Sequence, residues 1–380
     1  MNVLIILICF FLSGFFHQGL YLFMPFLTLF YLSYQKESKL ALNPISKIYL
    51  YVVLVTLGFF VIQSLLFSDI KMFSIKGWLR FVAYFSFAVL ISYMTKENIK
   101  YFFIVIVAYF ILTIPMGYYQ TIPDWGRYKN VLGHSNHLAY VLSMIIYFLV
   151  FNRPFKSKQV NIVCVILLFI SLLLTKSTGG LLVLVALIVY NAIKSKRISL
   201  LKKLTFLSLC IIALLLGINF SDKIAYQIES VDYITWDFVI ERVKNYTING
   251  VNRAGAHGSF VWRVLYWSKL LYTFFSESFL QITFGMGIDH LTKGYMPYDF
   301  MEKDPHNDFI KVLMEYGVLG LLFFLGFFRK IYKTINKNFN IIILIVVPMF
   351  FGNAIVNFSV NLIFILILMY EYKKGITKAI

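Results

Sequence analysis

Residues Ile341 to Phe351 read Ile-Ile-Ile-Leu-Ile-Val-Val-Pro-Met-Phe-Phe, so every position in this stretch is apolar. A lipid-facing strand of a membrane barrel alternates apolar and polar residues with a period of two, and this stretch shows no alternation. In the hydrocarbon of a membrane, only helices and closed barrels satisfy every backbone polar group. The stretch therefore predicts a helix buried in lipid and excludes a barrel.

The whole chain has the composition of a membrane protein. Of its 380 residues, 60% are hydrophobic and only 14% are charged, and the mean hydropathy is +0.79. A soluble domain carries roughly 25% charged residues, so a soluble fold is excluded. We predict an all-α protein, a polytopic bundle of transmembrane helices.

Apolar runs bounded by charges give about twelve candidate spans, because a helix needs about 20 apolar residues to cross the hydrocarbon. The predicted spans are Val3–Phe16, Gly19–Tyr34, Ile48–Phe67, Gly77–Met94, Tyr101–Tyr118, Asn136–Phe151, Val160–Thr175, Gly179–Ile193, Leu201–Phe220, Phe309–Phe328, Phe339–Ala354 and Val356–Tyr370. The first pair and the last pair are short and closely joined, so each pair could instead form a bent or re-entrant element. The N-terminal run has no basic leader and no small-residue cleavage site, which indicates an uncleaved membrane helix.

The Lys and Arg residues indicate which side of the membrane each connection faces, because cytoplasmic loops are enriched in them. With the N-terminus inside, the cytoplasmic segments hold twenty, and the short outside segments hold only Lys71, Lys76, Arg127, Lys129 and Lys176. This bias predicts that both termini lie in the cytoplasm. It also accounts for the net charge of +18. The basic residues form short clusters between apolar runs rather than one face that would bind nucleic acid.

One segment departs from the pattern of short connections. From Ser221 to Pro305 the chain is mixed in polarity, with eight basic and ten acidic residues. Connections longer than about 15 residues are usually functional or disordered, and this one is too aromatic for disorder. We predict an N-terminal bundle at 1–220, a large periplasmic loop at 221–305 and C-terminal membrane helices at 306–380. Amphipathic runs in the loop, such as Tyr266 to Phe279, are expected to lie at the lipid interface.

Residues capable of chemistry cluster in the long loop and at the other outside positions. In and after the loop they are Arg263 within Trp262 to Trp267, Gly285-Met286-Gly287 before Asp289, Pro305-His306-Asn307-Asp308, and Glu315-Tyr316-Gly317-Val318-Leu319-Gly320. Elsewhere they are Arg80, Arg127 with Lys129, Gly133-His134-Ser135-Asn136-His137-Leu138-Ala139, and Lys176 before Ser177-Thr178-Gly179-Gly180. The cysteines lie singly inside apolar stretches and are expected to be packing residues.

In their order, these motifs resemble those of the O-antigen ligase and Wzy-type O-antigen polymerase superfamily, whose members join glycans carried on undecaprenyl pyrophosphate. The features that carry the resemblance are the Gly-rich stretch Gly133 to Ala139, the turn Ser177 to Gly180, Arg263 followed by Trp267, and Gly285 to Gly287 followed by His306-Asn307 and Glu315 to Gly320. The resemblance covers roughly Arg80 to Gly320. One departure is that family members commonly carry Ser-Arg-Gly at the turn, where this chain has Lys176 before Ser177 to supply the charge.

The resemblance implies metal-independent glycosyl transfer with His306 as the general base. Such a transfer needs a base near neutral pKa to deprotonate an acceptor hydroxyl, and imidazole is the side chain closest to that value. Asn307 or a loop carboxylate would orient the imidazole. A histidine at a helix start can equally be a cap or an interface residue.

Arginines are the expected partners of the pyrophosphate leaving group. A guanidinium binds phosphate oxygens bidentately and keeps its charge at any relevant pH, which makes Arg263, Arg127 and Arg80 candidates, with Lys176 as a further cation. Arg263 and Arg127 could instead be solvated loop charges. Arg80 could snorkel toward the lipid head groups.

Polar and aromatic residues complete the predicted site. Asn136 either caps the following helix or binds substrate, and His137 is a second candidate for substrate binding. His134 and His137 are spaced like metal ligands, but no nearby carboxylate completes a set, so we predict no metal. Trp267 either anchors the chain at the interface or stacks on a sugar ring.

The predicted function is that of an O-antigen or related surface-polysaccharide polymerase, which joins lipid-linked repeat units by inverting transfer at the periplasmic face. An O-antigen ligase, whose acceptor is lipid A core, is the alternative within the superfamily. A flippase of lipid-linked sugars is the alternative outside it, although transporters commonly contain internal repeats and none is seen. Expected partners are undecaprenyl-pyrophosphate-linked oligosaccharides, membrane lipids and a chain-length regulator. No cofactor is expected, because the donor energy is already in the lipid phosphate.

Overall fold

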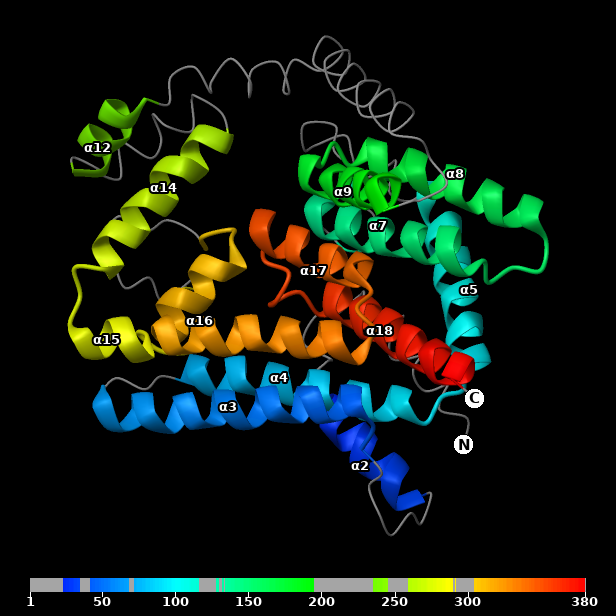
Figure 1. Ribbon diagram of the computed structural model, residues 1–380, viewed down its shortest axis with the longest axis horizontal. Coiled ribbons are helices and arrows are strands. Elements are labelled where there is room, and N and C mark those ends of the chain that lie inside the picture. Colours follow the sequence, from blue (N-terminus) through cyan, green and yellow to red (C-terminus); the bar gives the residue numbers. More distant parts are fainter. Residues whose placement is uncertain are drawn as a thin grey trace. The chain divides into compact units, whose positions relative to one another are not determined.

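The computed structural model describes residues 23–34, 42–67, 72–115, 128–129, 132, 134–194, 235–244, 259–289, 291 and 304–379 (Figure 1). No strand occurs in these ranges, and the prediction of an all-helical protein is confirmed for them. The helices are α2 (Met24–Tyr34), α3 (Pro44–Leu66), α4 (Met72–Ser92), α5 (Lys96–Leu112), α7 (Ser135–Asn152), α8 (Lys158–Leu174), α9 (Thr178–Lys194), α12 (Trp236–Lys244), α14 (Ser259–Phe274), α15 (Phe279–Phe284), α16 (Asp308–Thr334), α17 (Phe339–Phe351) and α18 (Phe358–Ala379).

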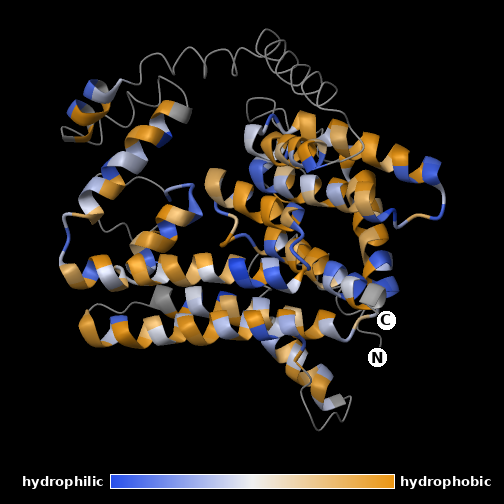
Figure 2. Ribbon diagram, in the orientation of Figure 1, coloured by the Kyte–Doolittle hydropathy of each residue, from blue (hydrophilic) through white to orange (hydrophobic). Residues whose placement is uncertain are grey.

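Within the described ranges, 4 helical stretches are long and apolar enough to cross a membrane: Pro44–Leu66, Ile75–Ser92, Ser135–Asn152 and Asp308–Thr334. Figure 2 shows α3 as hydrophobic along most of its length. The chain is therefore a membrane protein. The predicted spans Val3–Phe16 and Leu201–Phe220 lie outside the described residues, and each of the other predicted spans overlaps a described helix. Membrane crossing by the shorter helices stays a prediction.

Several helices begin where a short polar side chain precedes an apolar run. The side chain of Thr95 accepts a hydrogen bond from the N–H of Asn98 at the start of α5, and that of Ser157 accepts one from Val160 at the start of α8. These bonds satisfy backbone donors that have no partner within the helix. The sequence thus sets these helix starts locally.

The chain divides into two compact units, of which the first comprises Met1–Val61, Ile75–Leu187 and Phe323–Ile380. In this unit α7 packs against α8, and α18 packs against α5, α7 and α17 (Figure 1). Every residue from 358 to 370 in α18 is buried. The ring of Phe148 stacks on Phe103 with centroids 3.7 Å apart and meets Tyr370 edge-on at 4.9 Å. A helix that is apolar on all sides is expected to be buried in this way, so α18 forms the core of the first unit.

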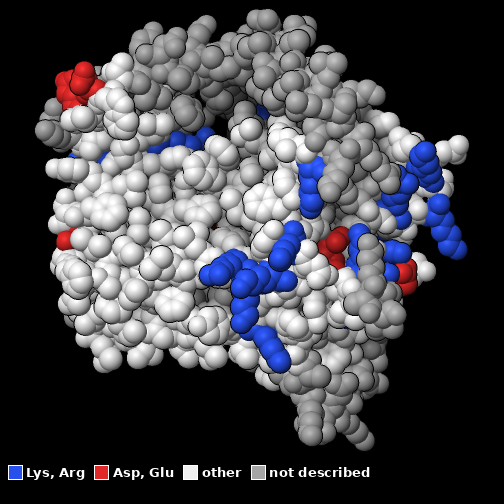
Figure 3. Space-filling model, in the orientation of Figure 1, with Lys and Arg blue, Asp and Glu red and all other residues white. Residues whose placement is uncertain are grey.

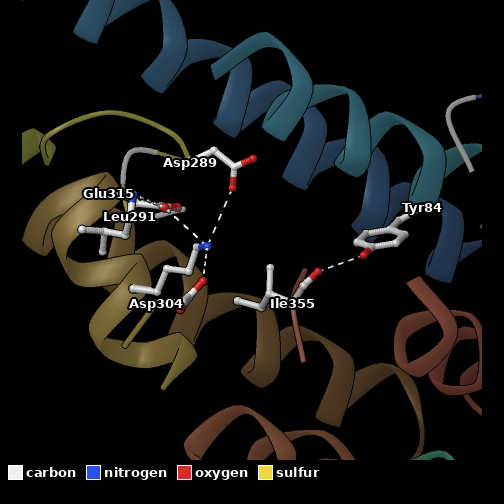
Figure 4. A network of polar contacts seen from close by, with 7 residues as sticks. Tyr84, Asp289, Leu291, Asp304, Glu315 and Ile355 are labelled. Atoms are coloured by element: carbon white, nitrogen blue, oxygen red, sulfur yellow. Dashed lines mark hydrogen bonds and ion pairs between the residues drawn. The ribbon is translucent and has the colours of Figure 1, made fainter. Parts of the chain in front are cut away.

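The connection between α17 and α18 is non-helical, and three of its carbonyl groups accept hydrogen bonds from side chains. Asn361 donates from Nδ2 to the carbonyl oxygens of Ala354 and Asn357 over 2.6 and 2.9 Å. The hydroxyl of Tyr84 donates to the carbonyl oxygen of Ile355 over 2.8 Å (Figure 4). Irregular backbone at membrane depth is tolerated only when it is satisfied within the protein, and these side chains meet that condition.

Glycine allows α9 to approach α7 closely in the first unit. A Cβ at Gly180 would stand 2.5 Å from the Cβ of Ala139. The hydroxyl of Ser143 donates to the carbonyl oxygen of Gly180 over 2.9 Å. Small residues at helix contacts, joined by short polar bonds, are a common way to pack membrane helices. The Ser-Thr-Gly-Gly turn therefore includes a packing element.

The second unit comprises Ile62–Ser74 and Ile188–Leu322. Its core gathers buried apolar residues of α14 and of the first half of α16: Val261, Trp262, Leu265, Tyr266, Leu270, Phe274, Ile310, Leu313 and Met314, together with Leu291. Helix α12 packs against α14, and Lys269 donates to the carbonyl oxygen of Val243 over 2.9 Å. The predicted division at residues 220 and 305 separates membrane helices from a loop outside the membrane. It stays a prediction.

The predicted amphipathic run Tyr266 to Phe279 is not one continuous helix. Helix α14 ends at Phe274, and α15 begins at Phe279 after a capping box formed by Ser278 and Gln281. Tyr266 is buried in the core rather than turned toward lipid. Tyr272 and Phe279 of the same run are exposed, so the position of the run at the lipid interface stays a prediction.

Candidate functional site

Helix α14 carries Arg263 and its neighbouring aromatic residues. Residues four apart lie on one face of a helix, so Trp262 lies beside Tyr266, and Arg263 lies beside Trp267. The Trp262 and Tyr266 rings are buried and stack with centroids 4.9 Å apart. Arg263 and Trp267 are half-buried. The guanidinium-bearing residue is thus held on a helix that is packed firmly into the core of the second unit.

The turn that contains His306 lies against this helix. Nε1 of Trp267 donates to the carbonyl oxygen of Pro305 over 2.7 Å, and the Trp262 ring meets the His306 ring edge-on with centroids 6.1 Å apart. His306 adopts a left-handed backbone conformation with φ of 53°. The structure therefore brings together two predicted motifs, the Arg263–Trp267 helix and the His306 turn. Trp267 and Pro305, which form the hydrogen bond between them, are 38 residues apart in the sequence.

Asn307 has a structural position at the start of α16. It is 3% exposed, and its Oδ1 accepts hydrogen bonds from the N–H groups of Phe309 over 2.9 Å and Ile310 over 3.1 Å. This is the arrangement of a helix N-cap, in which a side-chain oxygen satisfies backbone donors of the first turn. Substrate binding by Asn307 stays a prediction. Its Oδ1 is already engaged by the helix.

A buried ion cluster lies next to the His306 turn. Nζ of Lys311 lies 3.2 Å from Oδ2 of Asp304, 3.7 Å from Oδ1 of Asp289 and 3.7 Å from Oε1 of Glu315. Figure 4 shows the three carboxylates converging from separate segments. The Lys311 side chain is 3% exposed, and a charge buried to this degree needs ionic partners. We name these four residues the Lys311 cluster.

The Lys311 cluster was not predicted from the sequence. Lys311 and Glu315 stand four residues apart in a helix that is otherwise largely apolar, and ionisable residues inside a membrane helix usually have a function or a specific partner. That signal was present. The convergence of Asp289 and Asp304 on the same ammonium group depends on tertiary structure, and no spacing in the sequence predicts it.

The two glycine motifs meet backbone to backbone. Helix α16 is interrupted at Gly317, where φ is 69° and ψ is −171°. The N–H of Met286 donates to the carbonyl oxygen of Met314 over 2.8 Å, and the N–H of Gly287 donates to that of Glu315 over 3.2 Å. A Cβ at Gly285 would overlap the backbone of Glu315, and a Cβ at Gly317 would overlap the carbonyl group of Thr283. We name this contact of residues 285–287 with residues 314–317 the glycine crossing.

A glutamine from α3 closes the glycine crossing. Nε2 of Gln63, which is 5% exposed, donates to the carbonyl oxygens of Phe284 and Glu315 over 2.7 Å each. These carbonyl groups lie where the regular helical bonding is interrupted. Gln63 therefore supplies donors to carbonyl groups at the interruption of α16, an otherwise largely apolar helix. It was not recognised from sequence, because its partners lie more than two hundred residues further along the chain.

The predicted residues at the start of α7 belong to the first unit. The helix begins at Ser135, so His134 occupies the N-cap position and its side chain forms no capping hydrogen bond. Asn136 lies inside the first turn and is not the cap, which corrects one of its two predicted roles. The rings of His134 and His137 stack with centroids 4.4 Å apart. Substrate binding by Asn136 and His137 stays a prediction.

The remaining predicted cations also belong to the first unit or lie outside the described residues. Arg80 is half-buried on α4, and Lys176 is exposed between α8 and α9 with φ of 49°. The N–H of Tyr128 donates to the carbonyl oxygen of Leu174 over 3.1 Å, so the segment that carries Lys129 lies beside the turn at Lys176. Arg127 lies outside the described residues.

The described residues can therefore be sorted by unit. Arg263, Trp267, His306 and Asn307 lie together in the second unit, beside the Lys311 cluster. Arg80, Asn136, His137 and Lys176 lie in the first unit. Within the described ranges no group of three or more His, Cys, Asp or Glu residues could hold a metal ion.

The grouping in the second unit has the parts of an acid–base site. An imidazole can accept a proton, and a neighbouring helix carries a guanidinium that suits phosphate. The indole of Trp267 is half-buried and offers an apolar surface suited to a sugar face. The ammonium group of Lys311 offsets part of the charge of the three carboxylates, and the half-buried Arg263 on α14 supplies a second cation in the same unit.

Comparison with known proteins agrees with these motifs. Residues 162–325 match the family model described as O-antigen ligase, which confirms the resemblance to the O-antigen ligase and Wzy-type polymerase superfamily. The matched segment includes Lys176, Arg263, Trp267, His306, Asn307 and both halves of the glycine crossing. Arg80, Arg127, Asn136 and His137 precede it. No curated protein matches the chain.

Proposed function

We propose, from the match of residues 162–325 to the O-antigen ligase family, that this membrane protein is a surface-polysaccharide polymerase of the bacterial inner membrane. Its donor and acceptor would both be repeat units carried on undecaprenyl pyrophosphate. The segment 221–305 and the start of α16 would face the periplasm, where such units are joined. The observation that carries this proposal is the contact of the His306 turn with the helix of Arg263, through Trp262 and Trp267.

In the proposed reaction the acceptor hydroxyl attacks the anomeric carbon of the donor glycan. His306 accepts the hydroxyl proton as the new C–O bond forms on the face opposite the leaving group. The bond between the anomeric carbon and the phosphate oxygen breaks, and the lipid pyrophosphate leaves with both bonding electrons. Arg263 would neutralise this anion by the electrostatic stabilisation used at other phosphate sites, and pyrophosphate binding by Arg80, Arg127 and Lys176 stays a prediction. Metal ions are not needed for this step.

The proposed orientation places the basic end of α16 in the cytoplasm. Arg329, Lys330 and Lys333 are exposed there, and Figure 3 shows basic side chains gathered in groups on the visible face with sparse acidic ones. Clusters of this kind are typical of cytoplasmic ends. Reporter fusions after Lys378 and within 221–258 test the orientation, with a cytoplasmic signal expected from the first and a periplasmic signal from the second.

The catalytic proposal is tested with purified protein and labelled lipid-linked repeat units from its own host. His306→Asn is the sharpest variant, because asparagine tolerates the left-handed conformation but cannot act as the base. We expect it to fold and to lose about 10²- to 10⁴-fold in rate, the usual contribution of general base catalysis. Activity should persist in EDTA. Unchanged activity in folded His306→Asn would exclude the assigned base.

An O-antigen ligase is the second candidate, because the matching family carries that description. The two functions differ in their acceptor, which is a second lipid-linked unit for a polymerase and lipid A core for a ligase. Deletion of the gene distinguishes them. A polymerase mutant retains core capped by a single repeat unit, whereas a ligase mutant retains bare core.

A further inference from the structure

We propose that Lys311 and Trp267 are positioning residues that hold the turn presenting His306. This inference rests on the proposed function only in that His306 is taken as the base. The holding itself is a property of the turn and is measured independently of activity.

The first fixed point is Asp304, two residues before His306. Its Oδ2 lies 3.2 Å from Nζ of Lys311. Lys311 in turn is held by Asp289 and Glu315 at 3.7 Å each. A buried ammonium group that carboxylates contact from three separate segments has little freedom to move, so Asp304 is tied to a fixed point.

The second fixed point is Pro305, whose carbonyl oxygen accepts the 2.7 Å hydrogen bond from Nε1 of Trp267. Trp267 lies on α14, one helical turn beyond Arg263. The third is Asn307, whose side chain caps α16. The residues on both sides of His306 are therefore held by separate parts of the second unit, and its own ring rests edge-on against Trp262.

This holding is needed because His306 has φ of 53°. Left-handed backbone is intrinsically unfavourable for residues other than glycine, so a released turn would relax and carry the imidazole with it. Misplacement of a catalytic group by about 1 Å can cost about 100-fold in rate. The contact of Asp304 with Lys311 and the hydrogen bond from Trp267 thus both hold the turn that positions His306.

The test compares two isosteric variants that each remove one carboxylate from Lys311. Asp304→Asn removes the charge from the link to the His306 turn and leaves an amide oxygen, which is a weaker acceptor for Nζ of Lys311. Asp289→Asn removes a partner on the segment after the glycine crossing and leaves the turn attached; its φ of 61° suits asparagine. In both variants Lys311 keeps two carboxylates. Trp267→Phe removes the other link and serves as the second test if Asp304→Asn does not fold.

The primary readout is the ring signal of His306 in protein labelled with ¹³C-histidine, assigned by its absence from His306→Asn. We expect Asp304→Asn and Trp267→Phe to shift or broaden this signal, and Asp289→Asn to leave it in place. With lipid-linked repeat units from the host as the probe, kcat should fall about 10- to 100-fold in the first two variants. KM should change little.

Two results would overturn the proposal. One is an unchanged His306 signal in folded Asp304→Asn. The other is an equal effect of Asp304→Asn and Asp289→Asn, which would make the cluster a support for the fold alone. For Trp267, a raised KM with an unshifted His306 signal would identify a sugar-stacking residue instead. If His306→Asn stays active while Asp304→Asn still shifts the signal, the proposed base is wrong and the positioning stands.

Discussion

The N–H of Met286 donates to the carbonyl oxygen of Met314 over 2.8 Å, although Met314 lies inside helix α16. In a continuous helix this carbonyl would accept from Val318, four residues on. The break at Gly317 removes that donor. The N–H groups of residues 286 and 287 take its place as donors. Two motifs that are separate in the sequence thus form the glycine crossing.

The glycine crossing predicts unequal effects of alanine at two glycines of α16. Gly317→Ala should lower the free energy of unfolding by about 1–3 kcal/mol, the cost of a non-glycine residue in a strained conformation, and the overlap with Thr283 adds to it. Gly326→Ala has open space around its Cβ and should be neutral or stabilising by up to about 1 kcal/mol. Thermal unfolding in detergent measures both. Equal losses would contradict the described break in the helix.

The hydrogen bonds of Gln63 allow a second test of the glycine crossing. Gln63→Met keeps the length of the side chain but removes the donor to Phe284 and Glu315, which should cost about 1–3 kcal/mol for buried carbonyl groups left without it. Thr56→Val is the control on the same helix. Its hydroxyl donates only to Val52 and Val53 within α3. Limited proteolysis at residues 285–291 should quicken in Gln63→Met alone; the same rate in both variants would argue against a special role for Gln63.

The helices could be predicted from the sequence because apolar length is a local signal. Runs such as Ile48 to Phe67 and Phe309 to Phe328 correspond to α3 and α16, although α3 begins earlier, at Pro44, and α16 continues past the bounding charges to Thr334. The interruption at Gly317 was not predicted. Glycine is tolerated inside helices, and only the partner segment at Gly285 shows why this one adopts a positive φ.

The candidate site was only partly predictable, because local sequence does not specify which distant segments come into contact. The family motifs identified Arg263, His306 and Trp267, and the contact between their segments is tertiary. The Lys311 cluster joins residues from three segments, and no local spacing specifies that Asp289 and Asp304 meet. Capping of α7, one of the two roles considered for Asn136, was wrong by two positions, because the helix begins at Ser135 after His134.

Lys176 allows stability and activity to be separated. It is exposed and has φ of 49°, so Lys176→Gly should keep or raise stability by up to about 1–2 kcal/mol, because glycine adopts this conformation without strain. If the ammonium group binds pyrophosphate, the same variant should raise KM for the lipid-linked donor. Lys176→Arg should retain activity. A fully active glycine variant would remove Lys176 from the proposed binding set.

Substitutions of Arg263 can separate the effect of its positive charge from that of its planar guanidinium geometry. Arg263→Lys keeps one positive charge but loses the planar fork that binds two phosphate oxygens at once. If Arg263 holds the departing pyrophosphate bidentately, the lysine variant should lose roughly 10-fold or more in kcat/KM, since each 1.4 kcal/mol of lost stabilisation is a factor of ten. Arg329→Lys, the same change at an exposed position of α16, should be unaffected. Arg263→Ala, which removes the charge altogether, should be inactive. If Arg263→Lys then has normal activity, a single positive charge is enough and the bidentate contact is excluded.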